Sequence, residues 1–185
     1  MQTVVKKKAI GTKEMALIGV MTAITCIAAP FSIYLPVSPV PLTLVSLALY
    51  FSLYVLGTKK ALISYAVYLA IGFVGLPVFS GFTGGIGRVA GPTGGYLIGF
   101  LFMIPVSGIL LEKLPKKIRF QIPALILGTL VCYLFGTLWL CVQLKMNFAG
   151  GLGVGVIPYL PGDLAKIVIA SMAGPVIAKT VNRAV

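Results

Sequence analysis

The chain has 185 residues, of which 59% are hydrophobic and only 10% are charged, with a formal net charge of +12 and a mean hydropathy of +1.08. Soluble domains carry about 25% charged residues because their surfaces face water, so this composition excludes a soluble protein and indicates an integral membrane protein. At about 20 residues per span, the length leaves room for roughly five to seven helices and none for an extramembrane catalytic domain.

The apolar runs predict six transmembrane helices and an all-α membrane protein. After a basic leader, no charge occurs from Met15 to Thr58, which is too long for one span, and a proline-rich break divides it in two. A basic turn at Lys59-Lys60 and a charged loop from Glu112 to Arg119 mark further boundaries. We expect residues 1–185 to form a single membrane-embedded domain. The predicted helices cover residues 15–29, 42–56, 61–75, 94–111, 121–143 and 162–181.

Two glycine-rich segments lie between predicted helices, at residues 75–95 and 147–155. We interpret the second as a connecting loop. The first is too long and too apolar for a simple connection, because irregular backbone at membrane depth is tolerated only where protein or a cavity satisfies it. Glycines permit close backbone approach and hinge motion, so we expect this segment to be a lid over a ligand cavity on the outer side.

The distribution of Lys and Arg predicts the orientation of the helices. With both termini in the cytoplasm, the outer side carries only Arg88, Lys145 and Lys166, and the inner side carries twelve basic residues. This positive-inside bias favours six spans over five or seven, in a multi-pass protein of the cell membrane. Because the charges cluster at helix ends, they indicate topology in the lipid bilayer and not a nucleic-acid partner. The inner residues are Lys6, Lys7, Lys8, Lys13, Lys59, Lys60, Lys113, Lys116, Lys117, Arg119, Lys179 and Arg183.

The sequence has three acidic residues, and two of them, Glu14 and Glu112, sit among lysines at inner helix ends, where we interpret them as interfacial. Asp163 is different. It opens the last predicted helix on the outer side, and Lys166 follows on the same helix face. One interpretation is a helix cap with a lysine that snorkels outward. The other is a polar anchor for a ligand, in which the carboxylate accepts N–H bonds and the ammonium donates to a carbonyl or carboxylate. Both can hold together.

Two further features are open to more than one interpretation. Arg88, in the first glycine-rich segment, is either a solvated loop charge or a clamp for a ligand carboxylate. Ala16, Gly19 and Ala23 form small steps on one side of the first predicted helix, which lets another membrane helix pack closely, although such spacing is common in apolar helices.

The sequence offers little for catalysis. It contains no His, the commonest general base and the usual zinc ligand, and no phosphate-binding P-loop. The three cysteines lie in apolar stretches, where a free thiol packs as a small hydrophobe. Because no nucleophile, base and orienting group form a plausible set, we expect no enzyme, no metal site and no cofactor.

Three segments together resemble the BioY family, the biotin-specific substrate-binding (S) components of energy-coupling factor (ECF) transporters. They are PVPLTL at residues 39–44, GLPVFSGFTGGIGRVAGPTGGYLIGF at 75–100 and PYLPGDLAKI at 158–167. The resemblance runs from the first helix to the last. It implies six membrane helices and an outward-facing pocket that captures biotin, the transported ligand, with high affinity.

The resemblance also implies partners. Such an S component associates with a transmembrane coupling protein (the T component) and two cytoplasmic ATPases, and it is thought to topple in the membrane to release its vitamin inside. The usual contact with the coupling protein is a small-residue motif on helix 1, which assigns partner docking to Ala16, Gly19 and Ala23. An S component for a different vitamin is the main alternative. A membrane enzyme and a self-sufficient secondary transporter are two others.

Matching motifs carry the ligand contacts over to this chain. Asp163 is expected to accept a ureido N–H of biotin, and Lys166 to donate to the ureido carbonyl or to pair with the carboxylate, for which Arg88 is the alternative partner. The PVPLTL and GPTGGY segments contribute Thr43, Gly94, Gly95 and Tyr96. Candidate apolar walls of the pocket, each also explicable as a packing aromatic, are Phe79, Tyr96, Tyr133 and Trp139.

Overall fold

The computed structural model describes residues 11–36 and 38–184, and each predicted membrane helix falls on a long helix of the structure. Lys6, Lys7 and Lys8, which belong to the predicted inner cluster, lie outside the described residues. The helices are α1 (Thr12–Ala28), α2 (Val45–Leu56), α3 (Thr58–Phe73), α4 (Ile86–Ala90), α5 (Gly94–Lys113), α6 (Ile118–Leu144), α7 (Phe148–Gly155), the 3-10 helix η1 (Ile157–Tyr159) and α8 (Leu160–Ala184).

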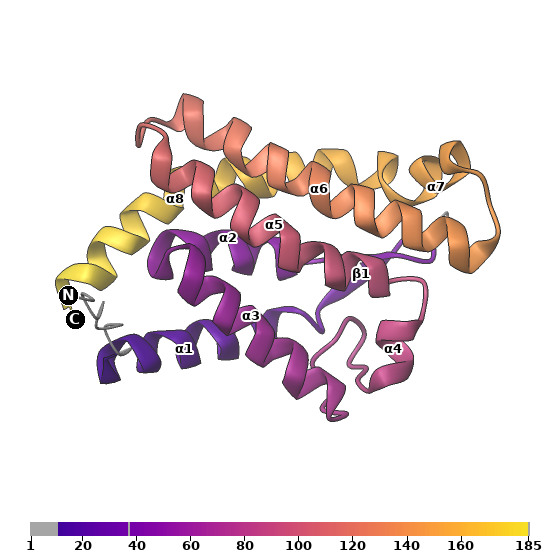
Figure 1. Ribbon diagram of the computed structural model, residues 1–185, viewed down its shortest axis with the longest axis horizontal. Helices are drawn as coiled ribbons and strands as arrows, with labels where there is room; N and C mark the ends of the chain where they lie inside the picture. The colour runs from indigo at the N-terminus through magenta and orange to yellow at the C-terminus, as the bar shows by residue number, and fades with distance from the viewer. Residues whose placement is uncertain (1–10, 37, 185) are drawn as a thin grey trace, which may run out of the picture.

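The long helices pack in pairs around α2 (Figure 1). Helix α5 packs along α6, α8 lies against α2, and α1 lies against α3. Helix α2 also contacts α1, α3 and α5, and nine of its 12 residues are buried. It is therefore the central helix of the bundle. Figure 1 shows that α1 begins at the end of the bundle where α8 finishes, and that α4 and α7 lie at the opposite end.

The segment predicted as a loop at residues 147–155 is instead mostly helical, so that prediction was wrong. Helix α7 begins after Asn147, whose side-chain oxygen accepts the backbone N–H of Gly150 at 2.8 Å. Before it, α6 ends at Lys145 in the left-handed conformation. The glycines misled the sequence reasoning because, away from water, a helix satisfies its backbone groups internally even where glycine weakens it.

The proline-rich break between α1 and α2 forms a two-stranded antiparallel ladder of β1 (Ser32–Tyr34) and β2 (Pro41–Thr43). Its register pairs Ile33 with Leu42. Side chains satisfy further backbone groups nearby: the Ser38 hydroxyl accepts the Val40 N–H at 3.1 Å, and the Tyr159 hydroxyl donates to the Val40 carbonyl. The ladder therefore fixes irregular backbone at the end of the bundle that holds α4 and α7 (Figure 1).

The first glycine-rich segment is folded back on the bundle. Phe79 and Thr83 form an isolated antiparallel bridge, and the Gly81 N–H donates to the Pro30 carbonyl at 3.0 Å. Phe79 is buried and packs edge-on against Tyr68, with ring centroids 5.6 Å apart. The segment thus covers the bundle with one anchored aromatic side chain.

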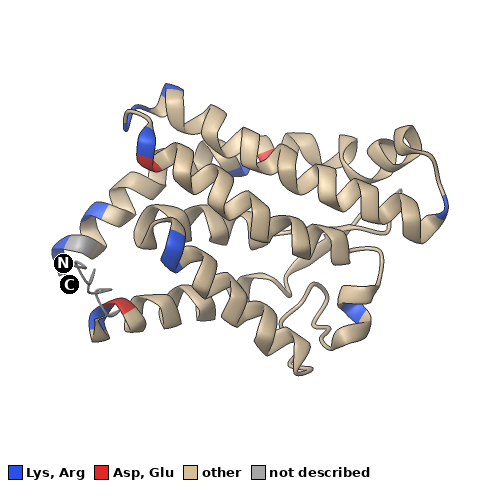
Figure 2. Ribbon diagram, viewed as in Figure 1, with Lys and Arg blue, Asp and Glu red and all other residues tan. Residues whose placement is uncertain are grey.

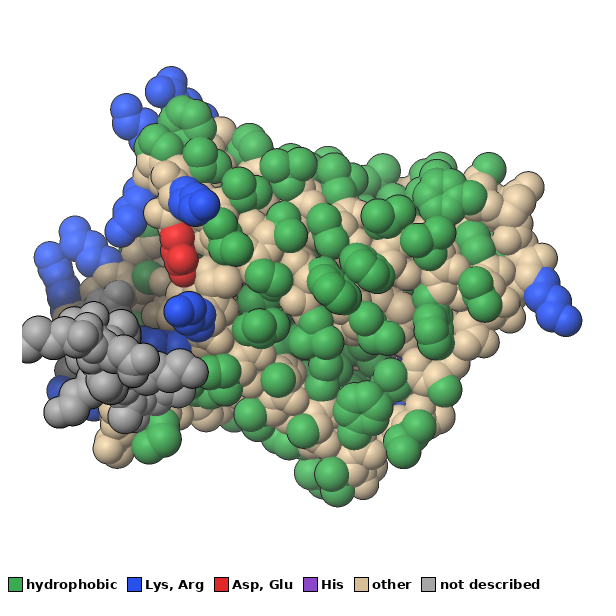
Figure 3. All heavy atoms as spheres, in the orientation of Figure 1, with side chains coloured by type: hydrophobic (Ala, Val, Ile, Leu, Met, Phe, Trp, Pro, Cys, Tyr) green, Lys and Arg blue, Asp and Glu red, His purple; other side chains and the backbone are tan. Residues whose placement is uncertain are grey.

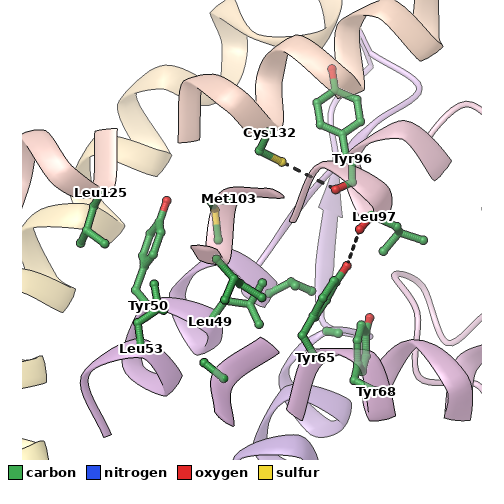
Figure 4. Close-up of a cluster of buried hydrophobic side chains, with 14 of the residues drawn as sticks. Leu49, Tyr50, Leu53, Tyr65, Tyr68, Tyr96, Leu97, Met103, Leu125 and Cys132 are labelled. Carbon is green, nitrogen blue, oxygen red and sulfur yellow. Dashed lines mark hydrogen bonds between the residues drawn. The ribbon is translucent and has the colours of Figure 1, made fainter. Parts of the chain in front are cut away.

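Tyrosine hydroxyls join the elements in the core (Figure 4). The fully buried Tyr65 donates from α3 to the Leu97 carbonyl of α5 at 2.8 Å. Tyr50 of α2 bonds Thr129 of α6 at 2.7 Å. Each of the eight tyrosines of the chain has its hydroxyl in a hydrogen bond. Such interhelical bonds matter in a bilayer, where apolar contact alone gives little preference for helix over lipid.

The surface matches a membrane environment. Figure 3 shows hydrophobic side chains over the middle of the visible face. By length and composition, three stretches of the described chain can cross a membrane: Gly94–Lys113, Ile118–Leu144 and Phe148–Val181. Basic residues gather at one end, at the start of α1 and α3, the α5–α6 turn and the end of α8 (Figure 2).

We predict that Tyr65→Phe lowers the thermal stability of the detergent-purified protein. The change removes one buried interhelical hydrogen bond, which in membrane proteins contributes about 1 kcal/mol. Thermal unfolding measured by circular dichroism should show a melting temperature a few degrees lower. The comparison is Tyr34→Phe, which removes two hydrogen bonds of a half-exposed hydroxyl, to the Ser80 carbonyl at 3.4 Å and from Arg88 at 3.1 Å. It should have less effect, because water can replace both partners there. Equal shifts in both variants would contradict the assignment.

Candidate functional site

A pocket lies between β2, the start of α2, the helices α5, α6 and α8, and the first glycine-rich segment. It has about 720 Å³ of space unoccupied by atoms, including the part that opens to solvent. Its walls are mostly apolar, as in small-molecule sites. The lining residues are Val40, Pro41, Leu42, Thr43, Val45, Ser46, Phe79, Ser80, Arg88, Thr93, Tyr96, Leu97, Phe100, Thr129, Cys132, Tyr133, Gly155, Tyr159, Asp163 and Lys166.

The polar centre of the pocket is the ion pair between Asp163 and Lys166. Helix α8 begins at Leu160, so Asp163 lies in its first turn, where the helix dipole favours a carboxylate. The spacing of three residues brings the Lys166 Nζ within 2.9 Å of the Asp163 Oδ1. The Asp163 side chain is only 14% exposed and the Lys166 side chain only 10%. Burial of this degree requires that both charges be paired.

Neighbouring elements complete the pairing of both charged groups. The Lys166 Nζ also donates to the Thr43 carbonyl at 2.7 Å and to the Ser46 Oγ at 3.4 Å, so all three of its donors have acceptors. The Tyr133 hydroxyl donates to the Asp163 Oδ2 at 2.5 Å. The pair thereby ties α8 to β2, α2 and α6. The carboxylate keeps further lone pairs for a ligand donor.

The outward-snorkelling interpretation of Lys166 is wrong. Its side chain turns inward, and the residue is buried against Thr43 and Ser46. Asp163 lies in the first turn of α8, where the helix dipole favours its charge, and it also lines the pocket, so these two expectations hold together.

Arg88 lies on the side of the same pocket that the first glycine-rich segment and α4 form. It lies in the five-residue helix α4 and is half-buried. Its Nη2 donates to the Tyr34 hydroxyl of β1 at 3.1 Å. Arg88 is therefore no simple solvated loop charge, and it brings a second cationic group to the pocket, from an element different from the one that carries Lys166.

Three predicted aromatic walls line the pocket: Phe79, Tyr96 and Tyr133. Sequence reasoning missed Ser46 and Tyr159. Tyr159 lies within the PYLPGDLAKI segment, so that motif was the available signal. Ser46 is an ordinary serine in an apolar helix, and only its contact with Lys166 reveals it.

Gly94, Gly95 and Trp139 lie outside the pocket lining, although we predicted them as ligand contacts. A Cβ at Gly95 would collide with the Trp139 side chain and come within 2.9 Å of the Phe135 carbonyl oxygen. The Trp139 indole N–H donates to the Gly91 carbonyl at 2.9 Å. Gly95 and Trp139 bring α5 and α6 close together, and Gly94 lets the backbone of α4 at Val89 approach α5. Tyr133 and Trp139 do point differently, as their spacing of six residues indicated.

The small residues of α1 are exposed. Ala16, Gly19 and Ala23 face away from the bundle, and no atom lies within 4 Å of a Cβ built at Gly19. The opposite face of α1, with Ile18 and Met21, is buried in the core. The geometry thus leaves the small-residue side of α1 free for another helix or for lipid.

The fold and the pocket define a class: a helical membrane protein with a mostly apolar pocket for a small molecule. A family model described as BioY matches residues 1–183. The chain belongs to the BioY family, whose members are multi-pass proteins of the plasma membrane, and this family comprises transporter subunits and not enzymes.

Individual relatives agree with this assignment. The chain is 36% identical over 158 residues to a probable biotin transporter BioY of Pyrococcus horikoshii, covering 85% of this chain and 91% of the relative. It is 34% identical over 160 residues to the biotin transporter BioY of Thermotoga maritima, covering 86% and 92%. A solved structure, the S component for biotin from an ECF-type ABC transporter, superposes with a TM-score of 0.84 at 27% identity, covering 92% of this chain and 95% of that one.

We predict that Gly95→Ala lowers the melting temperature by about 2–12 °C, because overpacking costs about 1–3 kcal/mol and a chain of this size shifts by about 2–4 °C per kcal/mol. The control is Gly153→Ala in α7, where a Cβ meets no atom within 4 Å. Differential scanning fluorimetry in detergent measures both. Unchanged stability of Gly95→Ala would contradict the packing role of Gly95.

Proposed function

We propose that this chain is the biotin-capturing S component of an ECF-type uptake transporter. The single observation that carries the proposal is a buried, fully paired Asp163–Lys166 centre inside an apolar pocket with a separate cation, Arg88, on its lid. The family and the names of its relatives support biotin as the ligand. Biotin has a polar ureido ring, an apolar thiophane ring and a carboxylate tail, and each finds a chemically matching part of this pocket.

The polar contacts divide between the two ends of the ligand. Asp163 accepts a ureido N–H with its remaining lone pairs. Lys166 holds that carboxylate in place, and it reaches the ligand only by exchanging one of its present acceptors, Thr43 or Ser46. Among the described residues, Arg88 has one hydrogen bond, to Tyr34, so its guanidinium keeps donors for the biotin carboxylate. Phe79 and Tyr96 flank the apolar ring.

Entry of the ligand requires the lid to move. The pocket is narrow in this conformation, and the first glycine-rich segment forms one of its walls. The lid is the first glycine-rich segment with α4, which carries Phe79, Ser80 and Arg88 to the pocket. Gly75, Gly81 and Gly85 have positive φ, a conformation that glycine adopts at little cost. They are the natural hinge positions of such a lid.

Transport needs partners in this proposal. The exposed Ala16, Gly19 and Ala23 side of α1 docks a T component by close helix packing, and two cytoplasmic ATPases drive release of biotin inside. The whole chain forms one membrane domain with six spans, both termini in the cytoplasm and the pocket open to the outside. The basic residues gathered at one end of the bundle support this orientation (Figure 2).

We predict that the stripped, detergent-purified chain binds biotin tightly at one site per chain in calorimetric titration. Asp163→Asn should weaken binding roughly 10- to 100-fold, because a hydrogen bond to a charged group contributes about 1.5–3 kcal/mol. Lys166→Ala should weaken it at least as much, since it leaves a buried carboxylate unpaired.

The control for this titration is Lys145→Ala, which removes an exposed lysine at the same end of the bundle and should bind biotin normally. Full affinity in both Asp163→Asn and Lys166→Ala would reject the site. Competition by thiamine or riboflavin in place of biotin would assign the chain to a different vitamin.

We predict the orientation from single cysteines in a background where Cys26, Cys132 and Cys141 are replaced by serine. Lys145→Cys should react with a membrane-impermeant maleimide in intact cells. Lys117→Cys, in the exposed α5–α6 turn, should react only after permeabilisation. The reverse pattern would place the termini and the basic end of the bundle outside the cell.

A further inference from the structure

A second, larger cavity lies at the opposite end of the bundle from the lid. It is bounded by α2, the α5–α6 turn and the last turns of α8, and it has about 1280 Å³ of space unoccupied by atoms, including the part that opens to solvent. Its walls combine apolar residues and glycines of α2 and α5 with charged residues at the rim. It shares no lining residue with the biotin pocket.

The rim of this cavity is cationic. Lys116 comes from the α5–α6 turn, and Lys179 and Arg183 come from consecutive turns near the end of α8. Against these three cations stands one carboxylate, Glu112, whose Oε1 already accepts the backbone N–H and the hydroxyl of Thr58 at 2.9 and 2.6 Å. The lining therefore has an excess of two positive charges, from three cations less one carboxylate.

A buried polar side chain lies inside this ring of charge. Gln121 of α6 is 5% exposed and lines the cavity. Its Oε1 accepts the Tyr54 hydroxyl at 2.9 Å, while its N–H2 group forms no hydrogen bond within the described part of the chain. Because Gln121 lines the cavity, these N–H groups are available to an acceptor placed there.

We propose that this cavity binds the phosphate-bearing headgroup of an anionic phospholipid. Arg and Lys hold phosphate oxygens through charge-assisted hydrogen bonds, and the Gln121 amide supplies a neutral donor deeper in the site. Basic pockets between transmembrane helices on the cytoplasmic side suit such headgroups.

The surroundings favour a lipid over a soluble phosphate compound. The residues of α8 beside Lys179 include Val176 and Ile177, which are exposed on the apolar outer surface. A headgroup in the cavity can therefore keep its acyl chains against α8.

Native mass spectrometry of the delipidated chain in detergent tests the proposal. The probe is phosphatidylglycerol, compared with phosphatidylcholine that carries the same acyl chains. We expect one phosphatidylglycerol to bind selectively. The combined variant Lys116→Gln, Lys179→Gln and Arg183→Gln should weaken that binding about tenfold or more, because each basic residue near anionic lipid contributes substantially. Biotin titration, at the separate pocket, verifies that the variant is folded.

The matched control carries the same loss of charge outside the cavity: Lys59→Gln, Lys113→Gln and Lys117→Gln. It should retain phosphatidylglycerol within about threefold, an allowance for weaker general attraction to anionic lipid. Equal losses in both combined variants would overturn the proposal, since they would show general attraction to a basic interface.

Two further arms make the result decisive. Gln121→Leu changes no charge and should still weaken phosphatidylglycerol binding severalfold, because one hydrogen bond is lost. If the combined variant does not fold, Gln121→Leu serves as the test of the cavity. Displacement of the lipid by millimolar glycerol phosphate or inorganic phosphate would overturn the lipid assignment in favour of a soluble phosphate ligand.

Discussion

The buried ion pair of Asp163 and Lys166 is the constraint on which the functional end of the protein depends. Two charges can stay away from water only if every donor and most acceptors have partners. Here the partners come from different elements: the Thr43 carbonyl from β2, Ser46 from α2 and the Tyr133 hydroxyl from α6. Satisfying the pair therefore also fixes how α8 sits against the rest of the bundle.

The rest of the bundle follows the same rule with neutral groups. Tyrosine hydroxyls reach across helices to carbonyls and hydroxyls, as Tyr65 does to Leu97 and Tyr96 does to Gly155. Each ring contributes packing and each hydroxyl selects one neighbour. Because lipid competes with apolar side chains for helix surfaces, these directed bonds specify which helices lie together. Glycines such as Gly95 then set how closely they approach.

The sequence alone predicted the features that are marked by a long apolar run or by an unusual charged residue. Long apolar runs located the six long helices, and an unexplained acid three residues before a lysine located the polar centre. It was insufficient where the outcome depends on distant partners. A glycine-rich stretch became α7, and Trp139 packed on Gly95 behind the pocket, because such outcomes depend on which surface each segment meets. Ser46 had no signal at all before its contact with Lys166 was visible.

The completeness of the polar centre also bears on how a ligand is selected. Since Lys166 already has three acceptors and Asp163 two donors, the site is organised before a ligand arrives. A ligand then adds its own contacts without having to order these side chains, which favours tight binding. In this proposal, selectivity comes from the glycine-rich segment, which is the part of the pocket that moves. Phe79 limits the width of the apolar space, and Arg88 sets the distance from Asp163 to the second charged group. In the proposed binding mode, the best ligand is one that places an N–H donor against Asp163 and a carboxylate against Arg88 at the separation these two side chains have in the pocket.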